Sequence, residues 1–256
     1  MTPPQPIALV TGATAGLGAE FSRQLATRGN KMVLVARNEE RLRQMSDDVG
    51  GAETISADLT TEAGVQKVLD RIADTDRPIT TLINNAGFAN HDPFLRSTSQ
   101  SEADAVNAMV RAVTLLCHAA APQMAKLGTG TIINVSSVSA YLTSSTYSAS
   151  KAYVTSLSEA LAEDLSGTGV KVCAVLPGFT RTEFHERANL DMSNLPDWMW
   201  LDAGHVVRVA LEDAARGKVI SVPGVQYKAI VGLLRAMPRR VVRRISSGSH
   251  RPSWQE

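Results

Sequence analysis

Short unbroken runs of apolar residues alternate along the chain with longer stretches in which apolar residues recur at helical spacing. Unbroken apolar runs are typical of parallel strands that are covered by helices on both faces. The runs predict seven strands, at Ile7–Val10, Lys31–Ala36, Glu53–Ser56, Thr81–Asn84, Thr131–Ser136, Val170–Leu176 and Lys218–Val222.

The stretches between these runs are predicted helices: one ends near Arg28, and the longest are Thr61–Thr75, Glu102–Lys126 and Ser148–Leu165. The repeated order of strand and helix predicts an α/β fold, a Rossmann-like, doubly wound parallel sheet of about seven strands with right-handed crossovers. A length of 256 residues fits one large domain better than two small ones. We place a dinucleotide-binding catalytic domain at residues 1–225 and a basic helical extension with a tail at residues 226–256.

Charge is distributed unevenly along the chain, although the net charge is only +1. Residues 214–255 contain nine bases and no acid, which leaves 17 bases against 25 acids elsewhere. The small total predicts no nucleic-acid partner. Within the basic part, Pro238 is expected to break the segment Tyr227–Ile245 into two short helices. The last residues, Ser246–Glu256, are expected to be a disordered tail.

Two roles are open to this basic segment. A basic amphipathic helix can lie as a peripheral element on an anionic membrane surface. Alternatively, the segment covers the mouth of a pocket and points its arginines toward water or a sister subunit. The sequence favours the second interpretation, because charged helix faces are most often simply solvated.

A few residue types predict compartment and metal content. Cys117 and Cys173 each lie in an apolar run, so we expect buried free thiols. The N-terminal residues lack the charged and then apolar pattern of a secretory signal, and a cytoplasmic protein is therefore expected. None of the five histidines has ligand spacing, and we expect no metal site.

Three glycines, Gly12, Gly16 and Gly18, follow the first predicted strand. Glycines in such a turn let the backbone approach a pyrophosphate, and the N-terminus of the next helix supplies N–H donors to it. Tight turns also use glycine without binding a ligand. The place of this turn, directly after the first strand, nevertheless favours a dinucleotide site.

The end of the second predicted strand distinguishes NAD from NADP. NAD-dependent enzymes usually place an acid there to bind the ribose 2′-hydroxyl. Here the strand end has no acid, and Arg37 follows it. A guanidinium suits a 2′-phosphate, so we expect NADP(H). The alternative is a solvent-exposed arginine that pairs with Glu39 or Glu40.

Three residues near the fifth strand predict acid–base chemistry. Ser137 follows that strand, and Tyr147 and Lys151 are four residues apart on the next helix, so they are neighbours on one face. An ammonium beside a phenol favours phenolate and lowers the pKa of tyrosine. Such a tyrosine can give a proton to a carbonyl oxygen or take it back, with Ser137 donating a hydrogen bond to the same oxygen. Any single Tyr-x-x-x-Lys spacing can also arise by chance.

These motifs, in this order, resemble the short-chain dehydrogenase/reductase family: TGATAGLG, NNAG, a serine after strand five, YSASK, and Pro177 followed by glycine, over roughly Ile7–Val222. The resemblance implies that Ser137 orients the substrate, Tyr147 is the general acid/base, and Lys151 binds the nicotinamide ribose. It implies a cofactor site formed by Gly12, Thr14, Gly16, Leu17, Gly18, Arg37, Asp58, Leu59, Asn84, Ala86, Gly87, Tyr147, Lys151, Pro177, Gly178, Thr180 and Thr182.

The chain departs from the family pattern at two places. The family usually has a catalytic asparagine at the position occupied here by Met109, and Asn107 is about 200° away around the helix. In the family this asparagine supports a helix bend that leads a water to the lysine. The interval from Ser137 to Tyr147 is also short, at ten residues, which predicts a tight loop beside the substrate.

The sequence therefore predicts an NADP(H)-dependent oxidoreductase that interconverts a hydrophobic ketone or aldehyde and its alcohol. The apolar cluster Trp198–Leu201 indicates a hydrophobic substrate or, equally, a lid packed on the core. The alternative function is a nucleotide-binding regulator on the same fold, which Met109 would support. The resemblance also implies a homo-oligomer, a dimer or tetramer that pairs the helices Glu102–Lys126 and Ser148–Leu165.

Overall fold

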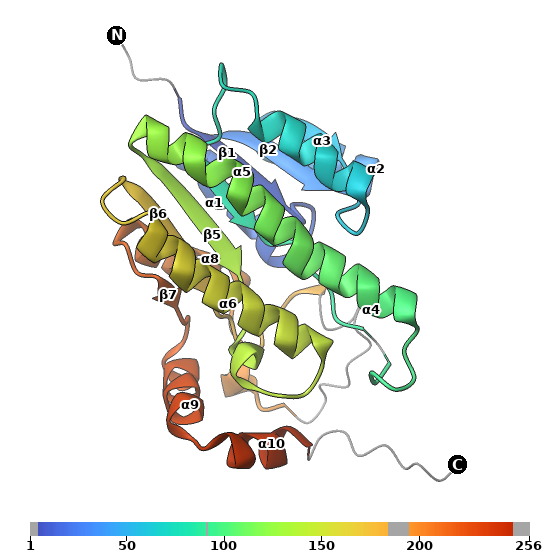
Figure 1. Cartoon of the computed structure of the whole chain (residues 1–256). Coiled ribbons are helices and arrows are strands. Elements are labelled where there is room, and N and C mark those ends of the chain that lie inside the picture. The colour runs from blue at the N-terminus through green and yellow to red at the C-terminus, as the bar shows by residue number, and fades with distance from the viewer. Residues whose placement is uncertain (1–4, 91, 184–194, 248–256) are drawn as a thin grey trace.

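A single parallel sheet with helices on both faces forms the molecule in a computed structural model that describes residues 5–90, 92–183 and 195–247 (Figure 1). The strands are β1 Ile7–Thr11, β2 Lys31–Ala36, β3 Ala52–Ser56, β4 Thr81–Asn84, β5 Gly130–Val135, β6 Val170–Val175 and β7 Ile220–Ser221. The main helices are α1 Gly16–Thr27, α2 Glu39–Asp48, α3 Glu62–Ile72, α4 Ser99–Val106, α5 Ala112–Leu127, α6 Thr146–Asp164, α8 Ala203–Ala215, α9 Val225–Ala236 and α10 Arg239–Ser247.

The strand order in the sheet is β3-β2-β1-β4-β5-β6-β7, and every neighbouring pair is parallel. This confirms the predicted doubly wound, seven-stranded sheet. The order reverses between β1 and β4, where Leu9 lies beside Val33 on one side and Leu82 on the other. Ligands of open α/β sheets bind in the crevice outside the carboxyl ends of the strands at such a reversal.

The two faces of the sheet carry separate apolar clusters, because successive strand residues point to opposite faces. Leu9, Val33 and Ile132 belong to one cluster, together with residues of α3, α5 and α6. Val10 and Leu34 belong to the other, with residues of α1 and α8. Burial on both faces is the reason that the strands appear in the sequence as unbroken apolar runs.

The predicted helix Glu102–Lys126 is longer and less regular in the structure. It runs from Ser99 to Leu127 as α4, a π-helical turn at Asn107–Arg111, and α5. Among the described residues this is one helix of 29 residues that is long and apolar enough to cross a membrane, but half of its apolar window is buried inside the fold. It packs beside α3 and β5, as a core helix of an α/β domain does.

Two predicted boundaries are wrong by a few residues. The helix expected to end at Thr75 ends at Ile72, because the Asp74 carboxylate accepts the N–H groups of Asp76 and Arg77 and forms a turn. Ser246, expected in a disordered tail, belongs to α10, and its Oγ accepts a hydrogen bond from Thr143 N at 3.1 Å. The rest of the expected tail, residues 248–256, lies outside the described residues.

The C-terminal extension forms two helices, and the predicted break at Pro238 is confirmed, since α9 ends at Ala236 and α10 begins at Arg239. Tyr227 attaches α9 to the domain. Its hydroxyl donates to Met199 O at 2.6 Å and accepts from Phe179 N at 3.0 Å. The inner face of α9 therefore covers the loop that follows β6.

Candidate active site

The turn between β1 and α1 has a backbone shape that only glycine allows. Gly12 and Gly16 have φ values of 65° and 52°, in the left-handed region. A Cβ on Gly18 would lie 2.1 Å from Gly12 O. The helix N-cap is Ala15, which has no side-chain acceptor for the first N–H groups of α1. The first N–H groups of α1 thus have no side-chain acceptor at the cap, and the glycines let a ligand approach the backbone closely, which fits a pyrophosphate.

Asn85 holds this turn against the end of β4. Its Nδ2 donates to Thr11 O at 3.0 Å and to Gly12 O at 3.2 Å. The backbone N–H groups of Asn85 and Ala86 both donate to Thr11 Oγ1. Asn85 belongs to the NNAG motif, but its role cannot be inferred from the sequence, because it joins two segments that are far apart in the chain.

Asn84 lies deeper than its predicted contact with a cofactor ribose requires. It is buried, and its Nδ2 donates to Asn134 Oδ1 at 2.8 Å and contacts Cys117 Sγ at 3.2 Å. Asn134 continues the network to Ser158 Oγ on α6. The side chain of Asn84 therefore joins β4 and β5 to the helix layer.

A cavity of about 320 Å³ lies at the carboxyl ends of β2 and β3 and is lined in part by Arg37, Asp58 and Lys67. The Arg37 side chain is 71% exposed, and its Nη1 is 4.0 Å from Asp58 Oδ2. Glu39 and Glu40, the alternative partners of Arg37, instead pair with Arg43.

Lys67, which the sequence analysis missed, brings a second cation to the same cavity. Its Nζ donates to Ser56 O at 3.1 Å. Leu59, a predicted cofactor residue, is buried among the core residues beside this cavity. Two cations at the place expected for an adenosine ribose fit a 2′-phosphate better than a 2′-hydroxyl.

The three predicted catalytic side chains meet at the carboxyl end of β5. Tyr147 is the second residue of α6, and Lys151 follows one turn later. The side chains of Ser137 and Tyr147 are hydrogen-bonded. Lys151 Nζ lies 5.5 Å from the centroid of the Tyr147 ring and donates to Val135 O at 2.7 Å.

Burial controls the protonation of this pair. Burial raises the pKa of Tyr147 to about 12, although the hydrogen bond with Ser137 acts in the opposite direction. Burial lowers the pKa of Lys151 to about 8. The expected lowering of the tyrosine pKa is not met in this structure, because the effect of burial is the larger one. Tyr147 therefore carries its proton at neutral pH.

Met109, which stands where the family has asparagine, lies within the π-helical turn and is buried. A Cβ built on Gly87 would be 3.2 Å from Met109 Cγ and 3.5 Å from Lys151 Nζ. The thioether thus fills the space beside the lysine, and the helix keeps its irregular turn without an asparagine amide at this position.

The loop after β6 reaches back over the glycine turn. The Thr182 side chain lies against Gly16, where an added Cβ would meet Thr182 Cβ at 3.2 Å. Glu183 Oε2 then pairs with Arg41 Nη1 of α2 at 3.1 Å. Earlier in the loop, Thr180 is buried, and its Oγ1 donates to Gly178 O. The predicted nicotinamide-side loop therefore borders the same crevice as the glycine turn.

The residues of the apolar cluster Trp198–Leu201 differ in exposure, so some fit the packing of a lid on the core and others fit contact with a hydrophobic substrate. Leu201 is buried, and Trp200 packs on Phe179 with ring centroids 6.1 Å apart. These residues fix the lid to the core. Trp198 is exposed, and Met199 and Trp200 are half-buried, so this part of the cluster remains open to a ligand. The first part of the predicted lid, residues 184–194, lies outside the described residues.

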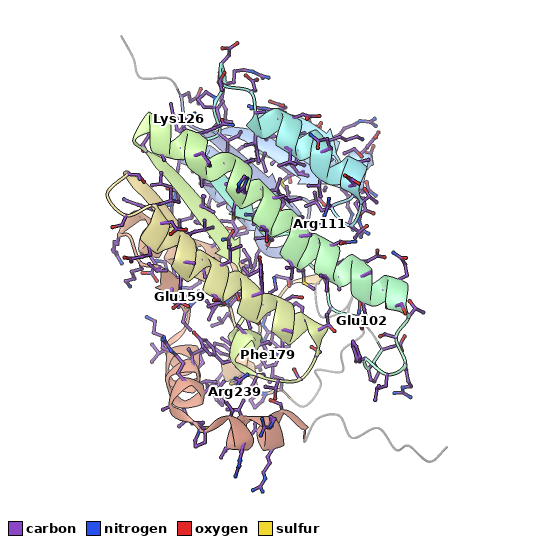
Figure 2. The ribbon with its side chains drawn as sticks, viewed as in Figure 1. Glu102, Arg111, Lys126, Glu159, Phe179 and Arg239 are labelled. Atoms are coloured by element: carbon purple, nitrogen blue, oxygen red, sulfur yellow. The ribbon has the colours of Figure 1, made fainter. Side chains whose placement is uncertain are left out.

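A second cavity, of about 480 Å³, borders the first turn of α6. Its wall combines apolar groups with hydroxyls and one guanidinium, and it is lined by Phe94, Ala140, Leu142, Thr143, Ser144, Ser145, Thr146, Ser148, Ala149, Ala152 and Arg239. Figure 2 labels Arg239, at the junction of α9 and α10, and Phe179 in the loop after β6.

Both cysteines are buried free thiols, as predicted, and burial raises the pKa of Cys117 and of Cys173 to about 12. Over residues 5–90, 92–183 and 195–247, no group of three or more His, Cys, Asp or Glu side chains is placed to hold a metal ion.

Known proteins share these features. The family described as short chain dehydrogenase matches residues 6–193. A curated relative, sulfoacetaldehyde reductase 2 of Chromohalobacter salexigens, is 34% identical over 186 residues, which cover 70% of this chain and 74% of the relative.

Two solved structures cover almost the whole chain. A short-chain dehydrogenase from Sphingobium yanoikuyae in complex with NADPH is 33% identical, with a TM-score of 0.80 and coverage of 98% of both chains. The bulky-bulky ketone specific alcohol dehydrogenase from Comamonas testosteroni is 31% identical, with a TM-score of 0.77 and coverage of 91% of this chain and 95% of its own.

Proposed function

Because the chain belongs to the short-chain dehydrogenase family, we propose that it is an NADP(H)-dependent reductase of hydrophobic ketones or aldehydes that uses Tyr147 as its general acid/base. The family and the relatives make the protein an oxidoreductase that acts on alcohol and carbonyl groups with a nicotinamide cofactor. The observation that carries the finer proposal is the meeting of Ser137, Tyr147 and Lys151 at the carboxyl end of β5, next to the glycine turn.

The residues present fit a dinucleotide. The glycine turn and the N-terminus of α1 would hold its pyrophosphate, Arg37 and Lys67 its adenosine end, and Lys151 its nicotinamide ribose. When bound, the nicotinamide supplies or accepts the hydride.

The chain's own groups then manage the oxygen of the substrate. In reduction, Ser137 donates a hydrogen bond to the carbonyl oxygen and so polarises it. The Tyr147 hydroxyl, protonated because burial raises its pKa to about 12, gives its proton to the forming alkoxide. The adjacent Lys151 ammonium stabilises the phenolate that remains. In the reverse direction the phenolate takes the alcohol proton.

Several observations support a hydrophobic carbonyl substrate. Trp198 is exposed beside the lid, and Phe94 and Leu142 line the cavity next to α6. The Comamonas relative is described as specific for bulky-bulky ketones. The Chromohalobacter relative is described as a sulfoacetaldehyde reductase, which supports a carbonyl substrate but not a hydrophobic one, because sulfoacetaldehyde carries a sulfonate. The direct test is a screen of NADPH oxidation by the purified protein against ketones and aldehydes of graded size. Absence of turnover with every carbonyl, although NADPH binds, would leave the nucleotide-binding regulator as the better proposal.

Arg37→Ala is expected to weaken NADPH binding by about 1.5–3 kcal/mol, tenfold or more, and to spare NADH. The reason is that the guanidinium faces the adenosine cavity and would make a charge-assisted contact with the 2′-phosphate. Fluorescence titration of both cofactors measures this, with Arg43→Ala, an exposed arginine on α2 paired with Glu39, as the matched control. Equal affinity of the native protein for NADPH and NADH contradicts the assignment.

Carbonyl reduction should lose rate as pH rises through about 8. The folded pKa of Lys151 is about 8, so the ammonium that stabilises the tyrosine phenolate is present below that pH and lost above it. Tyr147, with a pKa of about 12, stays protonated throughout and causes no second fall. Profiles of kcat/KM for reduction measure this effect. Lys151→Arg should remove the fall near pH 8 even if its rate is lower, and a flat native profile up to pH 10 would count against the role of Lys151.

Met109→Asn is expected to change turnover by less than about tenfold, or 1.4 kcal/mol. The native helix already has its π-helical turn at Asn107–Arg111, and the flexible thioether fills the space beside Lys151. Steady-state kinetics of both proteins on the best carbonyl decide the question. A gain of several hundredfold would show that the native chain is a crippled enzyme and would favour the regulatory alternative.

A cytoplasmic homo-oligomer is also part of the proposal. The helix α4–α5 and α6 lie side by side on one face of the molecule (Figure 1), and the Tyr153 hydroxyl of α6 is 2.9 Å from Thr114 Oγ1 of α5. Tyr153 and Val106 are exposed on these helices, which supports pairing through them.

A further inference from the structure

The outer faces of α9 and α10 form a surface that the proposed chemistry does not use. Both helices lie at one end of the molecule, away from β1, β2 and β3 (Figure 1). Tyr227 and Val231 on α9 and Val242 on α10 are buried. The exposed residues, here called the α9–α10 surface, are Val225, Lys228, Leu233, Arg235, Arg240, Val241, Arg243, Arg244 and Ile245; among them, Arg235 also lies over the Tyr141 ring, 5.9 Å from its centroid.

Apolar side chains are unusually prominent on this surface. Val225 is 80% exposed, Leu233 58%, Val241 41% and Ile245 52%. They make up four of the ten large apolar side chains that are exposed within the described ranges. Val241 and Ile245 are four residues apart, so they form one stripe along α10. Contiguous exposed apolar groups of this kind mark an interaction site more often than chance.

All the charged side chains on the α9–α10 surface are positive. Residues 214–255 contain no acid, and α9 and α10 together carry Lys228, Arg235 and four arginines of α10. Arg240 and Arg244 are also four residues apart and run beside the Val241–Ile245 stripe. The body of the protein is acidic, with 17 bases against 25 acids outside residues 214–255. This end is therefore a cationic patch beside a body that has an excess of acids, in a molecule with a net charge of +1.

The charge and the apolar groups together select the partner. A second copy that docked by two-fold symmetry would place this patch on itself and set arginines against arginines. A nucleic acid would be bound by the cations but would leave the apolar stripe without a partner, since such interfaces are largely polar. An anionic lipid surface accepts both features, because cations bind the headgroups while apolar side chains enter the boundary with the acyl chains.

We propose that the α9–α10 surface docks on an anionic lipid bilayer, with Val241 and Ile245 in the headgroup–acyl boundary and the flanking arginines against lipid phosphates. The sequence alone favours a segment that covers a pocket mouth and points its arginines toward water or a sister subunit. The exposed apolar stripe of α10 favours a membrane surface instead. Docking has a geometric consequence, because the Tyr227 hydroxyl connects α9 to Met199 O and Phe179 N. The loop after β6 and the described part of the lid around Met199 would then lie close to the membrane, where apolar molecules concentrate.

The test is flotation of the full-length protein with vesicles of phosphatidylcholine alone and of phosphatidylcholine with about a third phosphatidylserine. We expect binding to the anionic vesicles only, with a partition coefficient that falls as salt rises. The variant Arg240→Gln/Arg243→Gln/Arg244→Gln should lower that coefficient by about a hundredfold. The matched control Arg28→Gln/Lys31→Gln/Lys126→Gln removes the same charge from exposed positions; Lys126 lies at the end opposite Arg239 (Figure 2), and this variant should bind as wild type does.

A second variant separates insertion from simple electrostatic adsorption. Val241→Ser/Ile245→Ser keeps every charge and should lower the partition coefficient at least tenfold. NADPH binding in solution is measured on each variant as a test of folding, and it should not change. Three results overturn the proposal: no binding of the native protein to anionic vesicles, an equal loss in the control variant, or full binding by the serine variant.

Discussion

Replacing Tyr147 by phenylalanine is expected to lower the rate of carbonyl reduction by about 10²–10⁴-fold and to leave NADPH affinity close to that of the native protein. The substitution removes only the hydroxyl that bonds with Ser137. The ring keeps its buried place, 5.5 Å from Lys151 Nζ. The groups proposed to hold the cofactor, the glycine turn and Arg37, are not touched.

The same helix provides a matched control. Tyr153 lies six residues further along α6, is exposed, and bonds through its hydroxyl to Thr114 Oγ1. Tyr153→Phe should therefore show native rates. Steady-state NADPH oxidation with one fixed carbonyl gives the rates, and fluorescence titration gives the cofactor affinities. A Tyr147→Phe protein that keeps more than about a tenth of the native rate would end the acid–base assignment.

Gly18→Ala is expected to lower the free energy of unfolding by about 2–3 kcal/mol, which overpacking of a tight site typically costs. The new Cβ would be 2.1 Å from Gly12 O and 2.4 Å from Asn85 Nδ2. Both neighbours are fixed, because Gly12 is backbone of the turn and Asn85 bonds to Thr11 O and Gly12 O. In a domain of this size the melting temperature should fall by roughly 4–12 °C.

In this variant the affinity for NADPH should fall along with the free energy of unfolding, since the displaced Gly12 carbonyl belongs to the turn proposed to hold the pyrophosphate. Calorimetry with and without NADPH measures both effects, and the stabilisation by NADPH should be largely lost. Gly232→Ala is the control: it lies in α9 with no atom within 4 Å of the new Cβ, so alanine should be neutral or slightly stabilising. Native stability of Gly18→Ala would refute the packing argument.

The architecture could be predicted from the sequence because it depends on local patterns. Strand β6 is an example: Val172, Cys173 and Val175 are all buried, since the sheet is covered on both faces. Helix α6 could be predicted for a related reason, because Tyr147 and Lys151, four residues apart, are neighbours only if the segment is helical. Ends of elements were less accurate, as the Asp74 turn after α3 shows, because one side-chain hydrogen bond decides them.

The parts of the site that depend on distant contacts could not be predicted. The direction of the Tyr147 pKa shift depends on burial, which outweighs the hydrogen bond with Ser137. Lys67 enters the adenosine cavity only because α3 packs beside the end of β3. The ion pair between Arg41 and Glu183, which are far apart in the sequence, has no signal in either segment.

The strand order has a consequence for how the chain is synthesised. Strand β1 lies in the interior of the finished sheet, between β2 and β4. Its neighbour β4 is made much later: Ile7 N at the start of β1 bonds to the hydroxyl of Thr80, just before β4 and 73 positions along the chain. At ribosomal rates of about 5–20 residues per second, β1 can pair with β2 for several seconds while its other edge is open. During that interval an apolar, unpaired edge is exposed to other nascent chains. Expression at a lower temperature or with chaperones that shield such edges should therefore raise the soluble yield more than stabilising the finished fold would.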